Sequence, residues 1–354
     1  MAQFLPQPES PLKASAPRVL IVDDSAVARA ALSRFVAAGG RFAVAAALPD
    51  AQAALAFLAD CRVDLIVLDL EMPHTSGIDA LPALLKAGRG ARVLIVSSAA
   101  AEGAAVTMRA LALGAADTLV KPGTGAFASR FGVVLQERLA LLAASETAPA
   151  SPGIVPAIPD LTFDAIAIGA STGGIHALAS LLETIPAEVD QPIFITQHLP
   201  PSFSPFFAEQ VGVSARRAAL IGTDRRRVSR GEVMIAPGDA HLVVGALSNG
   251  RIATRLSRMA TATGNLPSVD PMFASLAQVY GARLLAVVLS GMGRDGLEGA
   301  RAVHDAGGTV VVQDQASSVV WGMPGVVARE GIARAVLPSA AIGAMIAATV
   351  RHGA

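Results

Sequence analysis

Three things are scarce in this 354-residue chain: cysteine, long apolar runs and an excess of either charge. A single cysteine, Cys61, excludes an internal disulfide framework and indicates a reducing compartment. The 28 Lys and Arg residues are balanced by 28 Asp and Glu residues, so no overall field attracts nucleic acid or an anionic membrane. No apolar run approaches the ~20 residues of a membrane span. We therefore expect a cytoplasmic protein that neither binds nucleic acid nor inserts into a membrane.

The length predicts two domains, because single cores rarely grow beyond about 250–300 residues. Residues 1–17 contain four prolines and no apolar core segment, which predicts a flexible leader and not a secretory signal. A second stretch with four prolines precedes Phe163 and lacks apolar periodicity, which is typical of a linker. The expected organisation is a domain over 18–143, a linker over 144–162 and a domain over 163–354.

The first domain alternates short apolar strands with helical patterns, as in a (βα)5 repeat with a parallel sheet. Polar residues follow four of the expected strands, and the carboxyl ends of parallel strands share one edge, where ligands bind. These residues are Asp23, Asp24, Asp69, Ser97 and Lys121.

Three carboxylates at one edge repel each other unless a hard cation joins them, and Mg²⁺ binds a few carboxylates together with water and phosphate oxygens. A lysine and a hydroxyl complete a pocket that can hold a phosphoryl group on one carboxylate. The alternative is that each carboxylate only caps a loop or a helix. The same chemistry at four strand ends favours the binding site.

Residues 18 to about 140 resemble a two-component receiver domain, which has a flavodoxin-like fold. The resemblance implies that Asp69 accepts the phosphoryl group and that Asp23 and Asp24 hold Mg²⁺ with it. Ser97 is then the switch hydroxyl, and Lys121 is the lysine before a proline. The sequence departs from the family pattern at Thr118, where an aromatic switch residue is usual, and in the loop 74–77. Both departures leave the details of the switch open.

The second domain opens with a buried strand pattern over 164–168, followed by Gly169-Ala170-Ser171-Thr172-Gly173 and a helical pattern over 175–182. This G-x-S-x-G spacing indicates a sharp strand-to-helix turn that exposes a serine. The alternative is a phosphate- or dinucleotide-binding turn. However, Ile175 replaces the lysine of a P-loop, and G-x-G-x-x-G is absent.

Two further residues follow strands that belong to the same expected sheet. His198 comes directly after the strand over 192–196, where an imidazole can act as a general base for Ser171. Asp295 lies in the glycine-rich loop after the strand over 283–289, either as a helix N-cap or as the acid that orients the histidine. His241 is the rival histidine; it opens a predicted β-hairpin, and we expect a structural role for it. The chain order Ser, His, Asp differs from that of the α/β-hydrolase fold.

Residues 163 to about 350 resemble the catalytic domain of the chemotaxis protein-glutamate methylesterase (CheB) family. The resemblance rests on Gly-Ala-Ser-Thr-Gly-Gly, Gln-His-Leu-Pro-Pro, Ala-Pro-Gly-Asp-Ala-His and Ser-Gly-Met-Gly-Arg-Asp-Gly, in this order. It implies a doubly wound, mostly parallel α/β/α domain with a β-hairpin. Ser171 is then the nucleophile, His198 the base and Asp295 the orienting acid, with Thr172 and the backbone N–H of Met292 at the oxyanion and substrate rim.

The same resemblance implies partners and regulation. The substrates are methyl-accepting chemoreceptors, on which glutamate methyl esters are hydrolysed and glutamines deamidated, and the esterase step needs no cofactor. A histidine kinase of the chemosensory array supplies the phosphoryl group, and the receiver covers the serine until it is phosphorylated.

The sequence also has alternative interpretations. The same esterase chemistry can serve a chemosensory pathway unrelated to motility, and the second domain can be a receptor-binding module without catalysis. A DNA-binding response regulator is disfavoured because the second domain is large, rich in strands and without a helix-turn-helix pattern.

Overall fold

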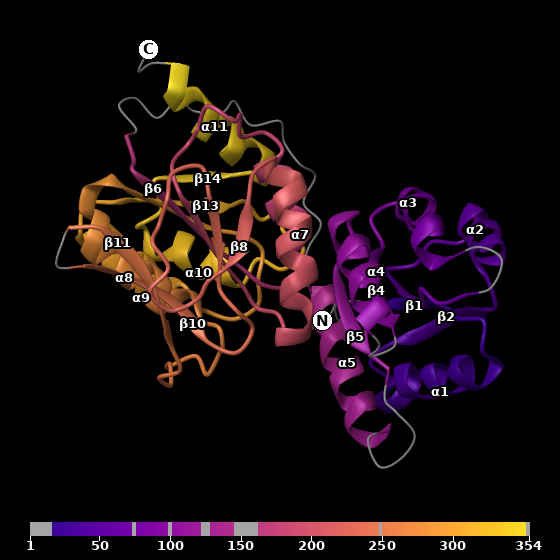
Figure 1. Ribbon diagram of the computed structural model, residues 1–354. Helices are drawn as coiled ribbons and strands as arrows, with labels where there is room; N and C mark the ends of the chain where they lie inside the picture. Colours follow the sequence, from indigo (N-terminus) through magenta and orange to yellow (C-terminus); the bar gives the residue numbers. More distant parts are fainter. Residues whose placement is uncertain are drawn as a thin grey trace, which may run out of the picture.

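The computed structural model describes residues 16–72, 76–97, 101–121, 128–144, 162–247 and 250–351, which form two α/β units side by side (Figure 1). The predictions for 1–15 and for 145–161, which include most of the expected leader and linker, lie outside these residues. No helix in the described ranges is both long and apolar enough to cross a membrane.

The first unit is a five-stranded parallel sheet in the order β2-β1-β3-β4-β5. Its strands are nearly continuous apolar runs, as expected for a parallel sheet covered on both faces. The expected (βα)5 repeat and the flavodoxin-like strand order are therefore confirmed. The elements are β1 (Arg18–Val22), α1 (Ala26–Ala37), β2 (Ala43–Leu48), α2 (Ala51–Asp60), β3 (Leu65–Leu68), α3 (Gly77–Ala87), β4 (Arg92–Ser97), α4 (Ala101–Ala112), β5 (Asp117–Val120) and α5 (Ala128–Ala144).

The second unit is a seven-stranded parallel sheet in the order β14-β13-β12-β6-β7-β9-β8, with a separate antiparallel pair, β10 and β11. The expected doubly wound sheet and hairpin are confirmed; β8 and β14 were not expected. The strands are β6 (Ala165–Ala170), β7 (Ile193–Gln197), β8 (Ala219–Ile221), β9 (Val233–Ile235), β10 (His241–Ala246), β11 (Ile252–Ser257), β12 (Leu284–Val288), β13 (Thr309–Gln313) and β14 (Ala335–Leu337). The helices are α6 (Gly174–Leu182), α7 (Ser204–Ala215), α8 (Val269–Tyr280), α9 (Leu297–Asp305), α10 (Met323–Glu330) and α11 (Ser339–Arg351).

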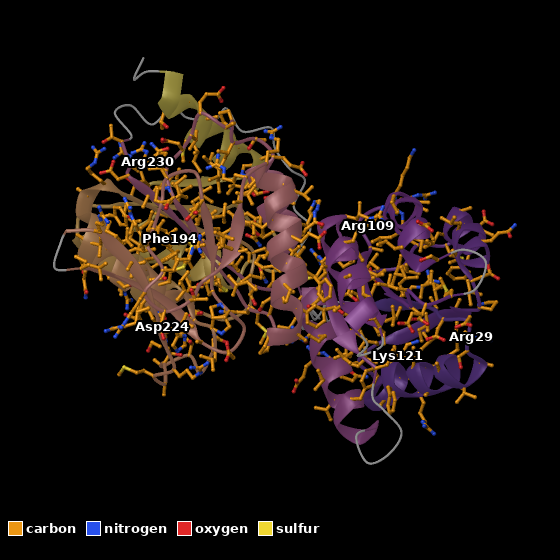
Figure 2. All side chains as sticks on the ribbon, viewed as in Figure 1. Arg29, Arg109, Lys121, Phe194, Asp224 and Arg230 are labelled. Atoms are coloured by element: carbon orange, nitrogen blue, oxygen red, sulfur yellow. The ribbon has the colours of Figure 1, made fainter. Side chains whose placement is uncertain are left out.

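This larger sheet has an apolar layer on each face, because alternate side chains of a strand point to opposite faces. Ile166 and Ile168 of β6 pack in the layer that includes residues of α6, α7 and α11. Ala165 and Ala167 pack in the opposite layer, with residues of α8, α9 and α10. Phe194 of β7 is fully buried in this second layer, in the middle of the unit (Figure 2).

The two units pack through α4, which contacts α6, α7 and the short 3₁₀ turn Pro201–Phe203. Met108 and Leu111 of α4 belong to one buried apolar cluster with Ile175 and Phe207 of the second unit. A polar contact adds to this interface: His176 Nδ1–H donates to the backbone oxygen of Ala112 at 3.0 Å. The receiver thus lies against the part of the second unit where α6 and α7 begin.

Candidate active site and phosphoacceptor site

Three neighbouring strands carry the three predicted catalytic side chains. Ser171 follows β6, His198 follows β7, and Asp295 lies in the loop after β12. In the sheet, β6 lies between β12 and β7, so all three residues are at one edge. From β6 the chain continues to β7 on one side, and from β12 it continues to β13 on the other, so the site lies where the strand order reverses, the position where open α/β sheets bind ligands.

The backbone around Ser171 is fixed from both sides. Its N–H donates to Ser290 O (3.0 Å), and its carbonyl oxygen accepts from Gln197 Nε2 (2.8 Å). A Cβ on Gly291 would lie 2.9 Å from Ser171 Cβ, so only glycine allows this loop so close to the serine. The prediction that the strand ends before Gly169 is wrong: β6 continues to Ala170, because Gly169 still pairs with neighbouring strands on both sides.

His198 and Asp295 form the buried part of the site. Asp295 is fully buried, and its Oδ2 lies 2.7 Å from His198 Nε2. Burial alone would raise the pKa of Asp295, but hydrogen bonds from His198, Ser268 and the Val269 N–H outweigh it and lower the pKa to about 2. The carboxylate is therefore charged at neutral pH and can stabilise an imidazolium. Since Nε2 is bound to the acid, Nδ1 is the ring nitrogen that can take a proton from Ser171.

The N-cap alternative for Asp295 is wrong for the helix that follows it, α9, whose N-cap is Gly296 without a side-chain hydrogen bond. His241 does not join the site: it is 1% exposed, and both its ring nitrogens bind backbone groups. Within the described ranges, no hydrogen bond joins Ser171 Oγ to the His198 ring, so the structure brings His198 and Asp295 together and places Ser171 at the same edge.

A cavity of about 760 Å³ lies between the two units at this edge. On one side it is lined by Ser171, Thr172, His198 and Met292, and on the other by receiver residues of α4, β5 and α5. Both predicted rim residues therefore line the same cavity as the serine and the histidine.

Thr172 also contacts the receiver directly. Its Oγ1 donates to Asp117 Oδ2 and accepts from Arg138 Nη1, both at 3.4 Å, while Asp117 and Arg138 form an ion pair at 2.7 Å. Burial raises the pKa of Asp117, and Arg138 opposes this shift. The residue after the candidate nucleophile thus touches a partly buried ion pair of the first unit.

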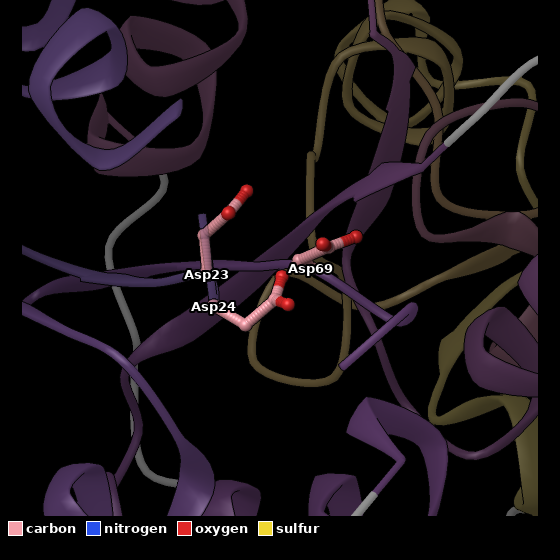
Figure 3. A group of neighbouring side chains, drawn as sticks. All are labelled: Asp23, Asp24 and Asp69. Atoms are coloured by element: carbon pink, nitrogen blue, oxygen red, sulfur yellow. The ribbon is translucent and has the colours of Figure 1, made fainter. Parts of the chain in front are cut away.

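The receiver holds a second cluster, at the ends of β1 and β3. Carboxylate oxygens of Asp23, Asp24 and Asp69 lie within 4.8 Å of one another (Figure 3). Lys121 Nζ lies 2.7 Å from Asp69 Oδ2 and 3.0 Å from Asp23 Oδ2. Burial raises the pKa of Asp69, against the lowering effect of Lys121. Hard oxygen donors in this number fit Mg²⁺, which takes water and phosphate oxygens for its remaining ligands.

Ser97 lies near the interface between the units. It is 1% exposed, and its Oγ pairs with Thr107 Oγ1 of α4 at 3.0 Å. Thr118 lies in β5 and lines the cavity between the units. The predicted switch residues are thus next to the elements that contact the second unit.

The sequence reasoning missed three residues that support the site. Ser290 accepts the Ser171 N–H and donates its own hydroxyl to Thr172 O (2.8 Å), Gln197 holds Ser171 O, and Ser268 donates to Asp295. Gln197 and Ser290 are the first residues of two of the motifs that carry the family resemblance, so their place in those motifs was the available signal. Ser268 had none.

The fold and the site together define the class of protein: a receiver-like domain with an acidic cluster, packed on a parallel α/β domain that carries Ser, His and Asp at one edge of its sheet. The chain matches the family model of the CheB methylesterase over residues 166–346 and that of the response regulator receiver domain over residues 19–126. The chain belongs to the CheB methylesterase family.

Relatives are similar over nearly the whole length. The protein-glutamate methylesterase/protein-glutamine glutaminase 2 of Caulobacter vibrioides is 40% identical, covering 94% of this chain and 99% of that protein. Protein-glutamate methylesterase/protein-glutamine glutaminase 1 of Paramagnetospirillum magneticum is 39% identical, covering 91% and 93%. The crystal structure of the Thermotoga maritima CheB methylesterase catalytic domain aligns with a TM-score of 0.51 and 34% identity, covering 53% of this chain and 99% of that one.

Proposed function

We propose that this chain hydrolyses glutamate γ-methyl esters, and deamidates glutamines, on methyl-accepting chemoreceptors. The observation that carries the proposal is the hydrogen-bonded His198–Asp295 pair at the sheet edge where Ser171 follows β6, with Ser171 and His198 lining one cavity. The names of the relatives at 39–40% identity, protein-glutamate methylesterase/protein-glutamine glutaminase, support protein-bound glutamate esters and glutamines as the reacting groups.

In the proposed reaction, Ser171 Oγ attacks the γ-carbonyl carbon while His198 Nδ1 takes its proton. Asp295 holds the ring through Nε2 and stabilises its charged form. The oxyanion is bound by backbone N–H groups, including that of Met292, with Thr172 at the rim. The imidazolium then protonates the leaving group, which departs as methanol or ammonia. Water, activated by the same histidine, hydrolyses the acyl-enzyme and restores Ser171. We propose that the esterase reaction needs no metal ion or cofactor.

The test is release of methanol from methylated chemoreceptors by Ser171→Ala, with Ser180→Ala in α6 as the matched control. Loss of a triad nucleophile lowers kcat by several orders of magnitude, about 10⁶-fold where it has been dissected. Ser180→Ala should keep the wild-type rate. A Ser171→Ala protein with most of its activity would refute the assignment.

We further propose that activity is controlled at Asp69. The domains are taken as 18–143 and 163–354, joined by a linker over 144–162, in a cytoplasmic protein. Asp23, Asp24 and Asp69 would hold Mg²⁺, which when bound would neutralise charge on the incoming phosphoryl group. A histidine kinase supplies that group, and the phosphorylated receiver moves away from the cavity it lines.

The test of this regulation compares the esterase rate with and without a small-molecule phosphodonor and Mg²⁺. Wild type should be activated, whereas Asp69→Asn, which has the same shape but cannot form the acyl phosphate, should stay at the basal rate. Equal activation of both proteins would refute regulation at Asp69.

A further inference from the structure

The acid of the candidate triad sits at the start of a helix. Asp295 accepts the N–H of Val269 at 2.8 Å and that of Asp270 at 3.4 Å, and these are the first two residues of α8. Free N–H groups and the helix dipole make such an end favourable for an anion. Asp295 therefore acts as the cap of α8, which lies far from it in sequence.

Ser268 is the N-cap residue of α8 by position but not by hydrogen bonding. Its backbone is extended (φ −122°, ψ 146°), as at an N-cap, yet its side chain makes no cap hydrogen bond. An N-cap serine normally accepts an N–H from its own helix. Here the fully buried hydroxyl donates instead to Asp295 Oδ1 at 2.6 Å.

His241 holds Ser268 from the other side. Its Nδ1 accepts the Ser268 N–H at 2.9 Å, so the ring proton is on Nε2, which donates to Met259 O at 2.8 Å. His241 is the first residue of β10 and is 1% exposed. Its two hydrogen bonds therefore connect the start of α8 to the β-hairpin.

We infer that Ser268 and His241 are positioning residues for Asp295, an inference that rests on the proposed function. Asp295 Oδ2 faces His198 and the Val269 N–H, while Oδ1 is held by Ser268. Because both carboxylate oxygens are held by hydrogen bonds, the orientation of the carboxylate plane is fixed. The orientation of the His198 ring that is hydrogen-bonded to it is then fixed as well. Partners that orient a catalytic group in this way govern its geometry without touching substrate.

The first test is Ser268→Ala, with Ser275→Ala as control. Ser275 is also in α8, and its hydroxyl joins the same helix to β10 through Val244 N, away from Asp295. We expect Ser268→Ala to lower kcat by about 10- to 100-fold with KM nearly unchanged, because misplacement of a catalytic group costs on this scale. Losing a donor makes the Asp295 carboxylate more basic, so the acidic limb of the kcat/KM profile should move to higher pH. Ser275→Ala should keep the wild-type kcat and pH profile, whatever stability it loses.

The second test separates the two nitrogens of His241. In His241→Asn the side-chain oxygen takes the place of Nδ1 and can still accept the Ser268 N–H; in His241→Gln the amide nitrogen takes the place of Nε2 and can still donate to Met259 O. Each substitution removes one of the two hydrogen bonds that His241 makes. We expect His241→Asn to keep most of kcat and His241→Gln to resemble Ser268→Ala. Equal loss in both would overturn the role of His241 through Ser268.

A readout without substrate keeps this inference distinct from the proposed function. The ring proton shared by His198 and Asp295 gives a downfield proton NMR signal, which should shift in Ser268→Ala and His241→Gln but not in Ser275→Ala. An unshifted signal together with a wild-type kcat in Ser268→Ala would overturn the inference. If Ser171→Ala kept its activity while the signal shifted, the proposed function would fail and the positioning role would stand.

Discussion

Thr107→Val is expected to make the protein more responsive to phosphorylation. Thr107 is fully buried in α4, the receiver helix that packs on the second unit, and its hydroxyl is the partner of Ser97 at 3.0 Å. As the switch hydroxyl that the receiver resemblance implies, Ser97 must release Thr107 before its hydroxyl can bind the phosphoryl group on Asp69. Valine has nearly the shape of threonine but cannot make this bond, so the resting state alone is weakened.

The magnitude follows from the burial of the pair. A buried hydroxyl left without a partner costs about 1–3 kcal/mol, and Ser97 would be in that position in the resting variant. A phosphoryl oxygen supplies a new partner, so the whole penalty favours the phosphorylated state. At 1.4 kcal/mol per tenfold change, the phosphodonor concentration for half-activation should fall by about 5- to 140-fold.

The assay measures esterase rate against phosphodonor concentration at fixed Mg²⁺. The basal rate of Thr107→Val should stay near wild type, because without a phosphoryl group Ser97 has no other place to turn. Ser97→Ala is the control of opposite sign, since it removes the hydroxyl that the phosphoryl group needs and should blunt activation. An activation curve for Thr107→Val that overlays the wild-type curve would refute the reasoning.

Three further predictions concern the catalytic domain. Gly291→Ala should lower kcat at least tenfold, because the new Cβ would lie 2.3 Å from Met323 Sδ and 2.9 Å from Ser171 Cβ. The control is Gly245→Ala in β10, whose Cβ would have no atom within 4 Å and which should keep the wild-type kcat. Equal kcat values for the two variants would contradict this prediction. Phe194→Ala should reduce the free energy of unfolding by about 3–5 kcal/mol in urea denaturation; a loss below 1 kcal/mol would be inconsistent with its complete burial. Burial and the nearby Asp295 raise the pKa of Asp270 from 3.8 to about 6, so wild type loses stability as pH rises from about 4 to above 6. Asp270→Asn cannot ionise and should be more stable than wild type at pH 8, by up to about 3 kcal/mol, but not at pH 4; an equal difference at both pH values would exclude the shift.

The fold was largely predictable because its strands are apolar runs long enough to recognise. The missed strands, β8 and β14, are three-residue edge strands that are incompletely buried, whereas the equally short β9 is fully buried and reads as an apolar run. At Gly169 the prediction ended a strand that the sheet continues. The reason is tertiary: a Cβ there would lie 2.4 Å from Val269 Cγ1, so glycine is needed for the close approach of α8 and not for a turn.

The edge of the candidate site was predictable for a topological reason, since residues that directly follow adjacent parallel strands must meet. The hydrogen bonds that hold Asp295 in place were not predictable from the sequence. Ser268 is 27 residues away in sequence, and its contact depends on how α8 packs across the sheet. No local pattern distinguishes a serine that caps its own helix from one that donates to a distant carboxylate. His241 was expected to be structural, and its hydrogen bonds show which structure it holds.

Two paths lead from the phosphoacceptor to the serine edge, and they are separable. One runs through Ser97 and Thr107 into α4. The other is β5 itself: Lys121, directly after the strand, binds Asp69, while Asp117 at its first residue contacts Thr172 beside Ser171. In the proposed regulation, a phosphoryl group on Asp69 would change the hydrogen-bond partner of Lys121 as well as that of Ser97, so both paths would respond to the same event. Thr107→Val disturbs only the first, and Arg138→Ala, which removes the ion-pair partner of Asp117, only the second. If each variant alters activation and the double variant shows the sum, the paths are independent; a double variant no different from either single one would mean that α4 and β5 move as one body.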